Sequence, residues 1–93
     1  MQRRNIVLIN PRGLHARVAS KIVDTTKAFA ASVQIEWRDK QVDAKSIMAL
    51  LMLGAPVGSE LTITTEGEDE AAALARLVHL AEAGFGELED EPF

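Results

Sequence analysis

The chain has 93 residues, of which 47% are hydrophobic and none is cysteine. This length fits one domain with a single core, and the missing cysteines exclude disulfides, a thiol nucleophile and a zinc–thiolate site. The net charge is −4, but residues 1–45 carry a net +5 and residues 46–93 a net −9, so the first half favours an anionic partner.

Other classes of protein are disfavoured by the same inspection. No apolar run approaches about 20 residues, so we expect no membrane insertion. The charged beginning of the chain does not resemble a signal peptide, which favours a cytoplasmic protein. Basic residues interleaved with aromatic ones are missing, so nucleic acid is not an expected partner.

The first elements are a strand and a helix. Asn5–Ile9 is β-branched and apolar on both faces, which predicts a central or well-covered strand. Pro11 and Gly13 then predict a loop. From Ala16 to Phe29 apolar residues recur every three or four positions, which predicts an amphipathic helix.

The middle of the chain predicts a hairpin and a short helix. Ser32–Trp37 alternates polar and apolar residues, and Gln41–Ala44 returns after a polar turn, so the two segments predict paired strands. Ile47–Leu53 is apolar and lies between Ser46, a good N-cap, and Gly54, a good helix end. We therefore predict a two-turn helix there.

The last elements are a strand over Glu60–Glu66 and a helix that is capped by Asp69 and stops at Gly84. The order β-α-β-β-α-β-α predicts an α+β fold in which three helices cover one face of a four-stranded sheet. The polar positions of the strands would face water; they are Gln34, Glu36, Thr62 and Thr64. We expect one domain over residues 1–86, followed by an acidic, flexible tail over 87–93.

The junction between the first strand and the first helix has the residues of an anion site. If the helix starts at Ala16, then His15 is its N-cap and the backbone amides of Ala16 and Arg17 are unpaired at the positive end of the helix dipole. The Arg17 guanidinium, and Arg12 from the loop, would add positive charge. A neutral imidazole beside such a site can accept a phosphoryl group and pass it on.

Hydrolytic and metal chemistry are less well supported. No nearby carboxylate, serine or cysteine completes an acyl-transfer triad with His15. With only His15 and His79 in the chain, we expect no metal site, and nothing indicates a cofactor. We interpret His79 as a solvated residue on the outer face of the last helix.

Two motifs resemble one family. Gly13-Leu14-His15-Ala16-Arg17 resembles the active-site signature of HPr-like phosphocarriers of the phosphoenolpyruvate-dependent phosphotransferase system, and Lys45–Gly54 resembles their regulatory-serine segment. The resemblance covers residues 3–86. It implies an open-faced β-sandwich with a four-stranded antiparallel sheet, and a phosphoryl carrier rather than a turnover enzyme.

The resemblance also implies roles for individual residues. His15 would be phosphorylated on Nδ1 by enzyme I and would donate to IIA-type domains, for sugar uptake or for regulation, while Arg17 steadies the phosphoryl group. Ser46 would be a regulatory phosphosite for an HPr kinase/phosphorylase. Leu50–Leu53 and Gly84–Gly86 resemble the corresponding segments of proteobacterial members, including those of the nitrogen-related branch. The family usually has proline where this chain has Val18, which bears on transfer rate and partner preference.

The short helix also predicts a docking surface. A two-turn helix can bury only one side, so part of its apolar surface should be exposed, as at protein interfaces. We expect the docking residues to combine apolar and basic side chains, namely Ile47, Met48 and Met52 with Arg12, Arg17, Ser20, Lys21 and Lys27. We expect the protein itself to be a monomer.

Two other functions fit the element order. One is a small-ligand-binding regulatory domain of the ACT type, which would form dimers around a ligand pocket. The other is an interaction module of the same family without the carrier step. The Gly13–Arg17 motif, with its histidine, argues against both.

Overall fold

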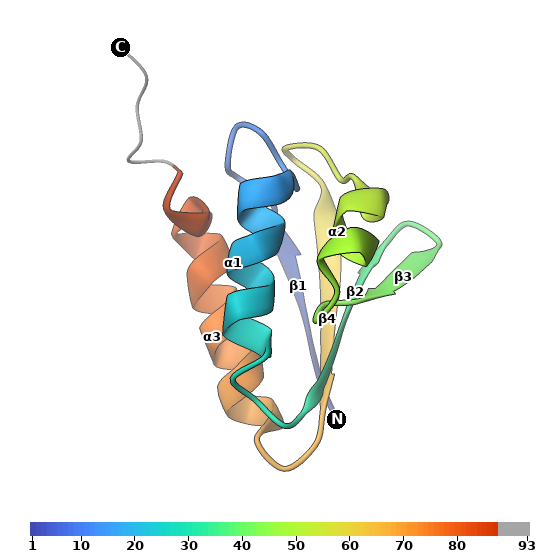
Figure 1. Ribbon diagram of the computed structural model, residues 1–93, viewed down its shortest axis with the longest axis vertical. Helices are drawn as coiled ribbons and strands as arrows, with labels where there is room; N and C mark the ends of the chain where they lie inside the picture. The colour runs from blue at the N-terminus through green and yellow to red at the C-terminus, as the bar shows by residue number, and fades with distance from the viewer. Residues whose placement is uncertain (88–93) are drawn as a thin grey trace.

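The computed structural model describes residues 1–87 of the chain, and its elements follow the predicted order (Figure 1). They are β1 (Gln2–Val7), α1 (Ala16–Thr26), β2 (Ser32–Trp37), β3 (Lys40–Asp43), α2 (Ile47–Leu53), β4 (Glu60–Glu66), α3 (Glu70–Glu82) and the 3₁₀ turn η1 (Gly84–Gly86). The strands form one sheet in the order β1-β4-β2-β3, and all neighbours are antiparallel. The three α-helices cover one face of this sheet, as the sequence predicted.

The core lies between the helices and the covered face of the sheet. Alternate residues of the central strands point into it, among them Val33 and Ile35 of β2 and Leu61 and Ile63 of β4. The apolar stripes of α1 and α3 pack on them, which confirms the helical periodicity. On the open face, Gln34 is exposed and Thr62 and Thr64 are half-buried, in agreement with the predicted wet side of the sheet.

One strand is placed differently from the prediction. β1 is an edge strand that pairs with β4 alone, from Gln2 opposite Thr65 to Val7 opposite Glu60. Of its six residues only Ile6 is buried, and Val7 and Ile9 are exposed. The prediction of a central or well-covered strand was therefore wrong, because burial of an apolar run depends on which strands flank it.

Helix α1 ends at Thr26, three residues before the predicted boundary. The Thr26 hydroxyl donates to the carbonyl of Ala44, 2.9 Å away. Beyond it, the amides of Ala30 and Ala31 donate to the Asp69 carboxylate at 2.9 and 2.8 Å. Asp69 occupies the N-cap position of α3, but the prediction that its side chain caps the helix was wrong, because the carboxylate is engaged by this turn instead.

The caps of α2 agree with the prediction. The Ser46 side chain accepts a hydrogen bond from the amide of Ala49 at 3.2 Å, and Gly54 adopts the left-handed conformation that ends many helices. The segment after Gly54 then leads to Ala55 and Pro56, beside the loop that precedes α1.

Candidate functional site

The loop between β1 and α1 is fixed by contact with the segment after α2. The amide of Leu14 donates to the carbonyl of Ala55 at 2.9 Å. Gly13 has a φ of +64°, and a Cβ at this position would lie 2.6 Å from the Ala55 oxygen. Glycine is therefore required both by the backbone conformation and by the close approach. The loop delivers His15 to the start of α1 in a defined position.

His15 is the N-cap of α1, as predicted. Its backbone is extended, and its carbonyl accepts from the amide of Ala19, which closes the first turn. Its side chain makes no capping hydrogen bond, so the imidazole does not occupy the amides at the positive end of the helix. The ring is 24% exposed and lies beside the first turn of α1.

The imidazole contacts the Glu87 carboxylate, so the expectation that no carboxylate lies near His15 was wrong; the partner is 72 positions away in the sequence. Nε2 of His15 lies 2.5 Å from Oε2 of Glu87, which is buried. Burial raises the pKa of the Glu87 carboxyl, but hydrogen bonds from Asn10 and His15 and the charges of His15 and Arg17 lower it by more, so its pKa is below the usual range. An ionised carboxylate only accepts hydrogen bonds, so the shared proton belongs to Nε2.

Asn10 holds this carboxylate from the other side. Its Nδ2 donates to Oε1 of Glu87 at 3.0 Å and to the carbonyl of Gly13 at 2.7 Å. The Asn10 side chain is fully buried, and within residues 1–87 its Oδ1 has no hydrogen-bond partner. Asn10 therefore joins the loop before α1 to Glu87 at the end of η1.

The turn η1 brings Glu87 to the site. Phe85 is buried in the core and has a φ of 55°, between Gly84 and Gly86, which both have positive φ. Glu87 is thus a packed residue, which corrects the expectation that a flexible tail begins there; residues 88–93 of that predicted tail lie outside the described residues. The large apolar Phe85 between two glycines was the signal in the sequence that this segment is anchored.

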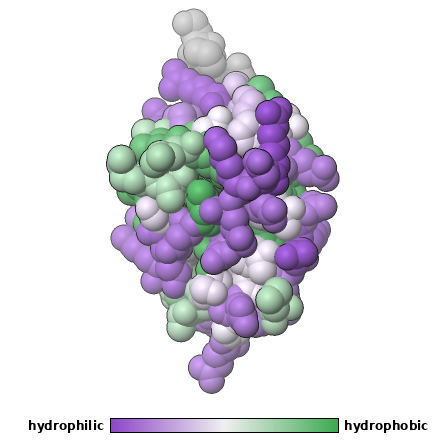
Figure 2. Space-filling model, turned by 90° about the vertical axis from the view of Figure 1, so that its right-hand side faces the viewer, coloured by the Kyte–Doolittle hydropathy of each residue, from purple (hydrophilic) through white to green (hydrophobic). Residues whose placement is uncertain are grey.

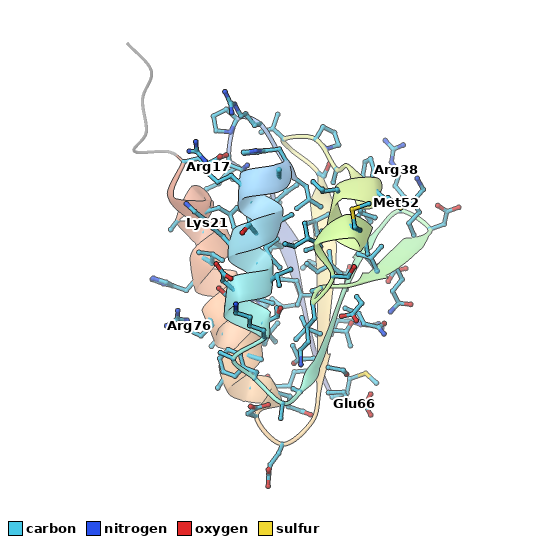
Figure 3. All side chains as sticks on the ribbon, in the orientation of Figure 1. Arg17, Lys21, Arg38, Met52, Glu66 and Arg76 are labelled. Carbon is cyan, nitrogen blue, oxygen red and sulfur yellow. The ribbon has the colours of Figure 1, made fainter. Side chains whose placement is uncertain are left out.

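The basic residues near His15 are not equivalent. Arg17 is exposed in the first turn of α1, and its charge acts on Glu87. Arg17 and Lys21 extend from α1 on the side of η1 and α3 (Figure 3). The Lys21 ammonium donates to the carbonyl of Phe85 at 2.6 Å, so this predicted docking residue also has a structural contact. Arg12 is exposed in the loop.

Two further predicted residues of α1 lie at different distances from the site. Ser20 is exposed in the middle of the helix. Lys27 is the C-cap of α1 and pairs with Asp24 at 3.2 Å. An 11-residue helix is about 17 Å long, so Lys27 lies at the far end from His15. Val18 is fully buried on the core side of α1, where it packs as an ordinary apolar residue.

Helix α2 exposes the apolar residues that the sequence predicted. We define the α2 surface as Ile47, Met48, Leu51 and Met52, all classed as exposed, with Met48 at 68% and Met52 at 77%. Figure 2 shows apolar side chains gathered on the upper part of this side of the molecule, bordered by hydrophilic ones. The C-terminal end of α2 adjoins the loop between β1 and α1, which we call the His15 loop. Ser46 lies at the N-terminal end of α2.

Several features bear on other chemistry. His79 is exposed on α3, as expected. Among residues 1–87, no group of three or more His, Cys, Asp or Glu side chains is arranged as metal ligands. None of the helices in this part of the chain is long and apolar enough to cross a membrane. At His15 one ring nitrogen is held by a carboxylate and the side chain is partly exposed.

Comparison with known proteins identifies relatives over nearly the whole chain. A family model described as "PTS HPr component phosphorylation site" matches residues 2–83. The phosphocarrier protein HPr of Cupriavidus necator is 42% identical over 87 residues, which cover 94% of this chain and 98% of that protein.

Solved structures agree with the match. The crystal structure of HPr-C-His from Thermoanaerobacter tengcongensis has a TM-score of 0.90 at 40% identity and covers 94% of this chain and 98% of that one. The Bacillus subtilis protein Crh, described as a dimer with a swapped domain, has a TM-score of 0.73 at 34% identity and covers 90% of this chain and 97% of its own. An ACT-type ligand-binding domain finds no support in these matches.

Proposed function

The chain belongs to the HPr family of phosphocarrier proteins of the phosphotransferase system, and we propose that His15 is the residue on which it carries the phosphoryl group. The protein is a phosphoryl carrier of this system. The observation that supports His15 is its position at the start of α1 with Nε2 engaged by Glu87. In the neutral ring the other nitrogen, Nδ1, then carries the lone pair that can attack phosphorus.

Electrostatics at this position suit a transferable phosphoryl group. The first amides of α1 and the positive end of its dipole favour an anion next to His15. Arg17 adds a guanidinium in the first turn, and we propose that it steadies the phosphoryl oxygens. Glu87, which carries a negative charge on the Nε2 side of the ring, moderates this attraction. A carrier needs such a balance, because a phosphoryl group bound too tightly would not be passed on.

The donor and acceptors follow from the family. We propose that phospho-enzyme I donates to His15 and that IIA-type domains receive from it, in the cytoplasm. The α2 surface adjoins the His15 loop and would contact both classes of partner, together with Arg12, Arg17 and Ser20. Which IIA-type domain accepts the phosphoryl group would distinguish a role in sugar uptake from a role in the nitrogen-related branch.

Ser46 has a structural role to which regulation would be added. Its hydroxyl caps α2 through Ala49, and we propose that an HPr kinase/phosphorylase can phosphorylate it. A phosphate there would lie at a helix N-terminus, which tolerates negative charge, and next to Ile47 of the α2 surface, where it would oppose docking.

We also propose a monomer. Asn10, His15, Arg17 and Glu87 come from one molecule, so the site is complete without a second copy. Light scattering on the purified protein measures its mass directly. A stable dimer in dilute solution would contradict the monomer while leaving the carrier role intact.

Phosphorylation with labelled phosphoenolpyruvate and enzyme I tests the assignment of His15. The wild-type protein and His79→Ala should each take up one acid-labile, base-stable phosphate, because His79 is exposed on α3 and far along the chain from the site. His15→Ala should take up none while remaining folded. Label on His15→Ala would overturn the proposal, and His79→Ala controls for the loss of an imidazole.

A further inference from the structure

We propose that Asn10 and Glu87 are positioning residues for phosphoryl transfer: Asn10 holds the Glu87 carboxylate, and the carboxylate holds the His15 proton on Nε2 so that Nδ1 presents its lone pair to phosphorus. The proposal rests on the proposed role of His15. It concerns the tautomer of the ring rather than the binding of the phosphoryl group.

The geometry of the three side chains leaves little freedom. One carboxylate oxygen of Glu87 faces Nε2 of His15 and the other faces Nδ2 of Asn10. The two hydrogens of the Asn10 amide are both used, one on Glu87 and one on the Gly13 carbonyl. A flipped amide would point Oδ1 at two acceptors, so the orientation is fixed.

The cost of this arrangement indicates a function. Asn10 is fully buried, and within the described part of the chain its Oδ1 has no partner. A buried unpaired acceptor destabilises the folded state. An apolar residue here would remove that acceptor, but it would also leave Glu87 and the Gly13 carbonyl without their amide donor. The two donated hydrogen bonds of Asn10 therefore place Glu87 and the backbone at Gly13, both of which adjoin His15.

The chemical step is consistent with this placement. The Nδ1 lone pair of His15 forms a bond to phosphorus, and the bond between phosphorus and the donor group of phospho-enzyme I breaks, its electron pair remaining on the donor. The Nε2 proton stays between Nε2 and Glu87. The ring becomes positively charged when Nδ1 is phosphorylated, and the Glu87 carboxylate offsets that charge from the opposite side of the ring.

The first test is spectroscopic and needs no partner protein. Nitrogen-15 NMR of the full chain, at a pH where the ring is neutral, reports the fraction of His15 with the proton on Nε2. We expect the wild type to be mainly Nε2–H and Glu87→Ala to shift towards Nδ1–H. Glu66→Ala removes a carboxylate at the opposite end of the molecule from Arg17 and should leave the fraction unchanged (Figure 3).

The second test is kinetic. The rate of phosphorylation by enzyme I should fall about ten- to a hundredfold in Glu87→Ala, the size expected for loss of one hydrogen bond to a charged group, and should be unchanged in Glu66→Ala. Asn10→Ala retains the Glu87 side chain but removes the hydrogen bond that holds it. The tautomer fraction and the rate should therefore change in the same direction as in Glu87→Ala, by a smaller factor. It also provides the test if Glu87→Ala does not fold.

The outcomes separate this inference from the proposed function. A folded Glu87→Ala or Asn10→Ala protein with an unchanged tautomer fraction and an unchanged rate would overturn the positioning role. A wild-type protein that takes no phosphate on His15 would overturn the proposed function, whatever the NMR result. A loss of stability in the variants without a tautomer shift would assign Glu87 and Asn10 a purely structural role and would likewise overturn the inference.

Discussion

The ammonium group of Lys21 lies 2.6 Å from the carbonyl oxygen of Phe85 and ties α1 to the turn η1. This hydrogen bond joins the helix whose N-cap is His15 to the turn that leads to Glu87. The Phe85 side chain is held by burial in the core, and this contact holds the backbone of the same turn. Lys21 therefore stabilises the arrangement from which the Glu87 carboxylate reaches the imidazole.

Replacing Lys21 by methionine should destabilise the fold. The substitution keeps the aliphatic stem but removes the charged donor, which leaves the Phe85 carbonyl without this partner and costs about 1–2 kcal/mol. Urea unfolding followed by circular dichroism measures the change. Lys27→Met is the control, because its exposed pair with Asp24 contributes only about 0–1 kcal/mol. Equal effects of the two substitutions would contradict the structural role of Lys21.

Gly13→Ala should be more disruptive than an ordinary loop substitution. The left-handed conformation alone costs about 1–2 kcal/mol for alanine, and the added Cβ would also collide with the backbone of Ala55 and Pro56. Gly58→Ala isolates the first effect, because φ there is +88° but no atom lies within 4 Å of the new Cβ. Thermal or urea unfolding should rank Gly13→Ala as the less stable protein, and the reverse order would show that the loop does not pack tightly there.

Asp69 gives the fold a pH dependence of known sign. Hydrogen bonds from the amides of Ala30 and Ala31 lower the pKa of its carboxyl. A group with a lowered pKa in the folded state contributes stability above its unfolded pKa, about 3.9 for aspartate, and loses that contribution as the pH falls through its folded value.

Denaturant unfolding at a series of pH values from 7 down to 2 tests this. The stability difference between the wild type and Asp69→Asn should be largest near neutral pH and should shrink in the acid range. Glu68→Gln removes an exposed neighbouring carboxylate as the matched control. A difference that did not change with pH would show that the Asp69 carboxylate is not held by the two amides.

A charge placed on the α2 surface should slow transfer without unfolding the protein. Met48 is 68% exposed, so Met48→Asp disturbs little of the core, but it would put a charge into an apolar contact with a partner. We expect phosphorylation by enzyme I to slow about tenfold, as for a loss of about 1.4 kcal/mol of transition-state binding. Ala72→Asp, on the exposed side of α3, is the control. Equal rates for both variants would remove Met48 from the interface.

Local patterns predicted much of the fold. β4 spans Glu60–Glu66 and α2 spans Ile47–Leu53 as expected, since strand alternation and helix caps involve residues close together in sequence. The position of β1 at the edge of the sheet was not predictable in this way. An apolar run reveals that a segment forms a strand, but its neighbours in the sheet are chosen by contacts with distant residues.

In the site, too, the residues that are close in sequence were predictable and the distant contacts were not. His15 and Arg17 are adjacent in the chain and share one helix start, so their motif could be recognised directly. Glu87 lies 72 positions from His15 and begins an acidic stretch that has the composition of a tail. Its role depends on Phe85 entering the core and on Asn10 meeting it, and neither contact leaves a periodic pattern in the sequence.

The distance along the chain between His15 and Glu87 also matters during synthesis. A ribosome makes His15 early, but it adds the carboxylate partner only after 72 more residues, a delay of roughly 4–14 s at ordinary translation rates. A nascent chain therefore has the histidine without the contact that sets its tautomer. The imidazole pairing is complete only once α3 and η1 have folded onto α1, so the state of His15 reports on whether the domain is finished.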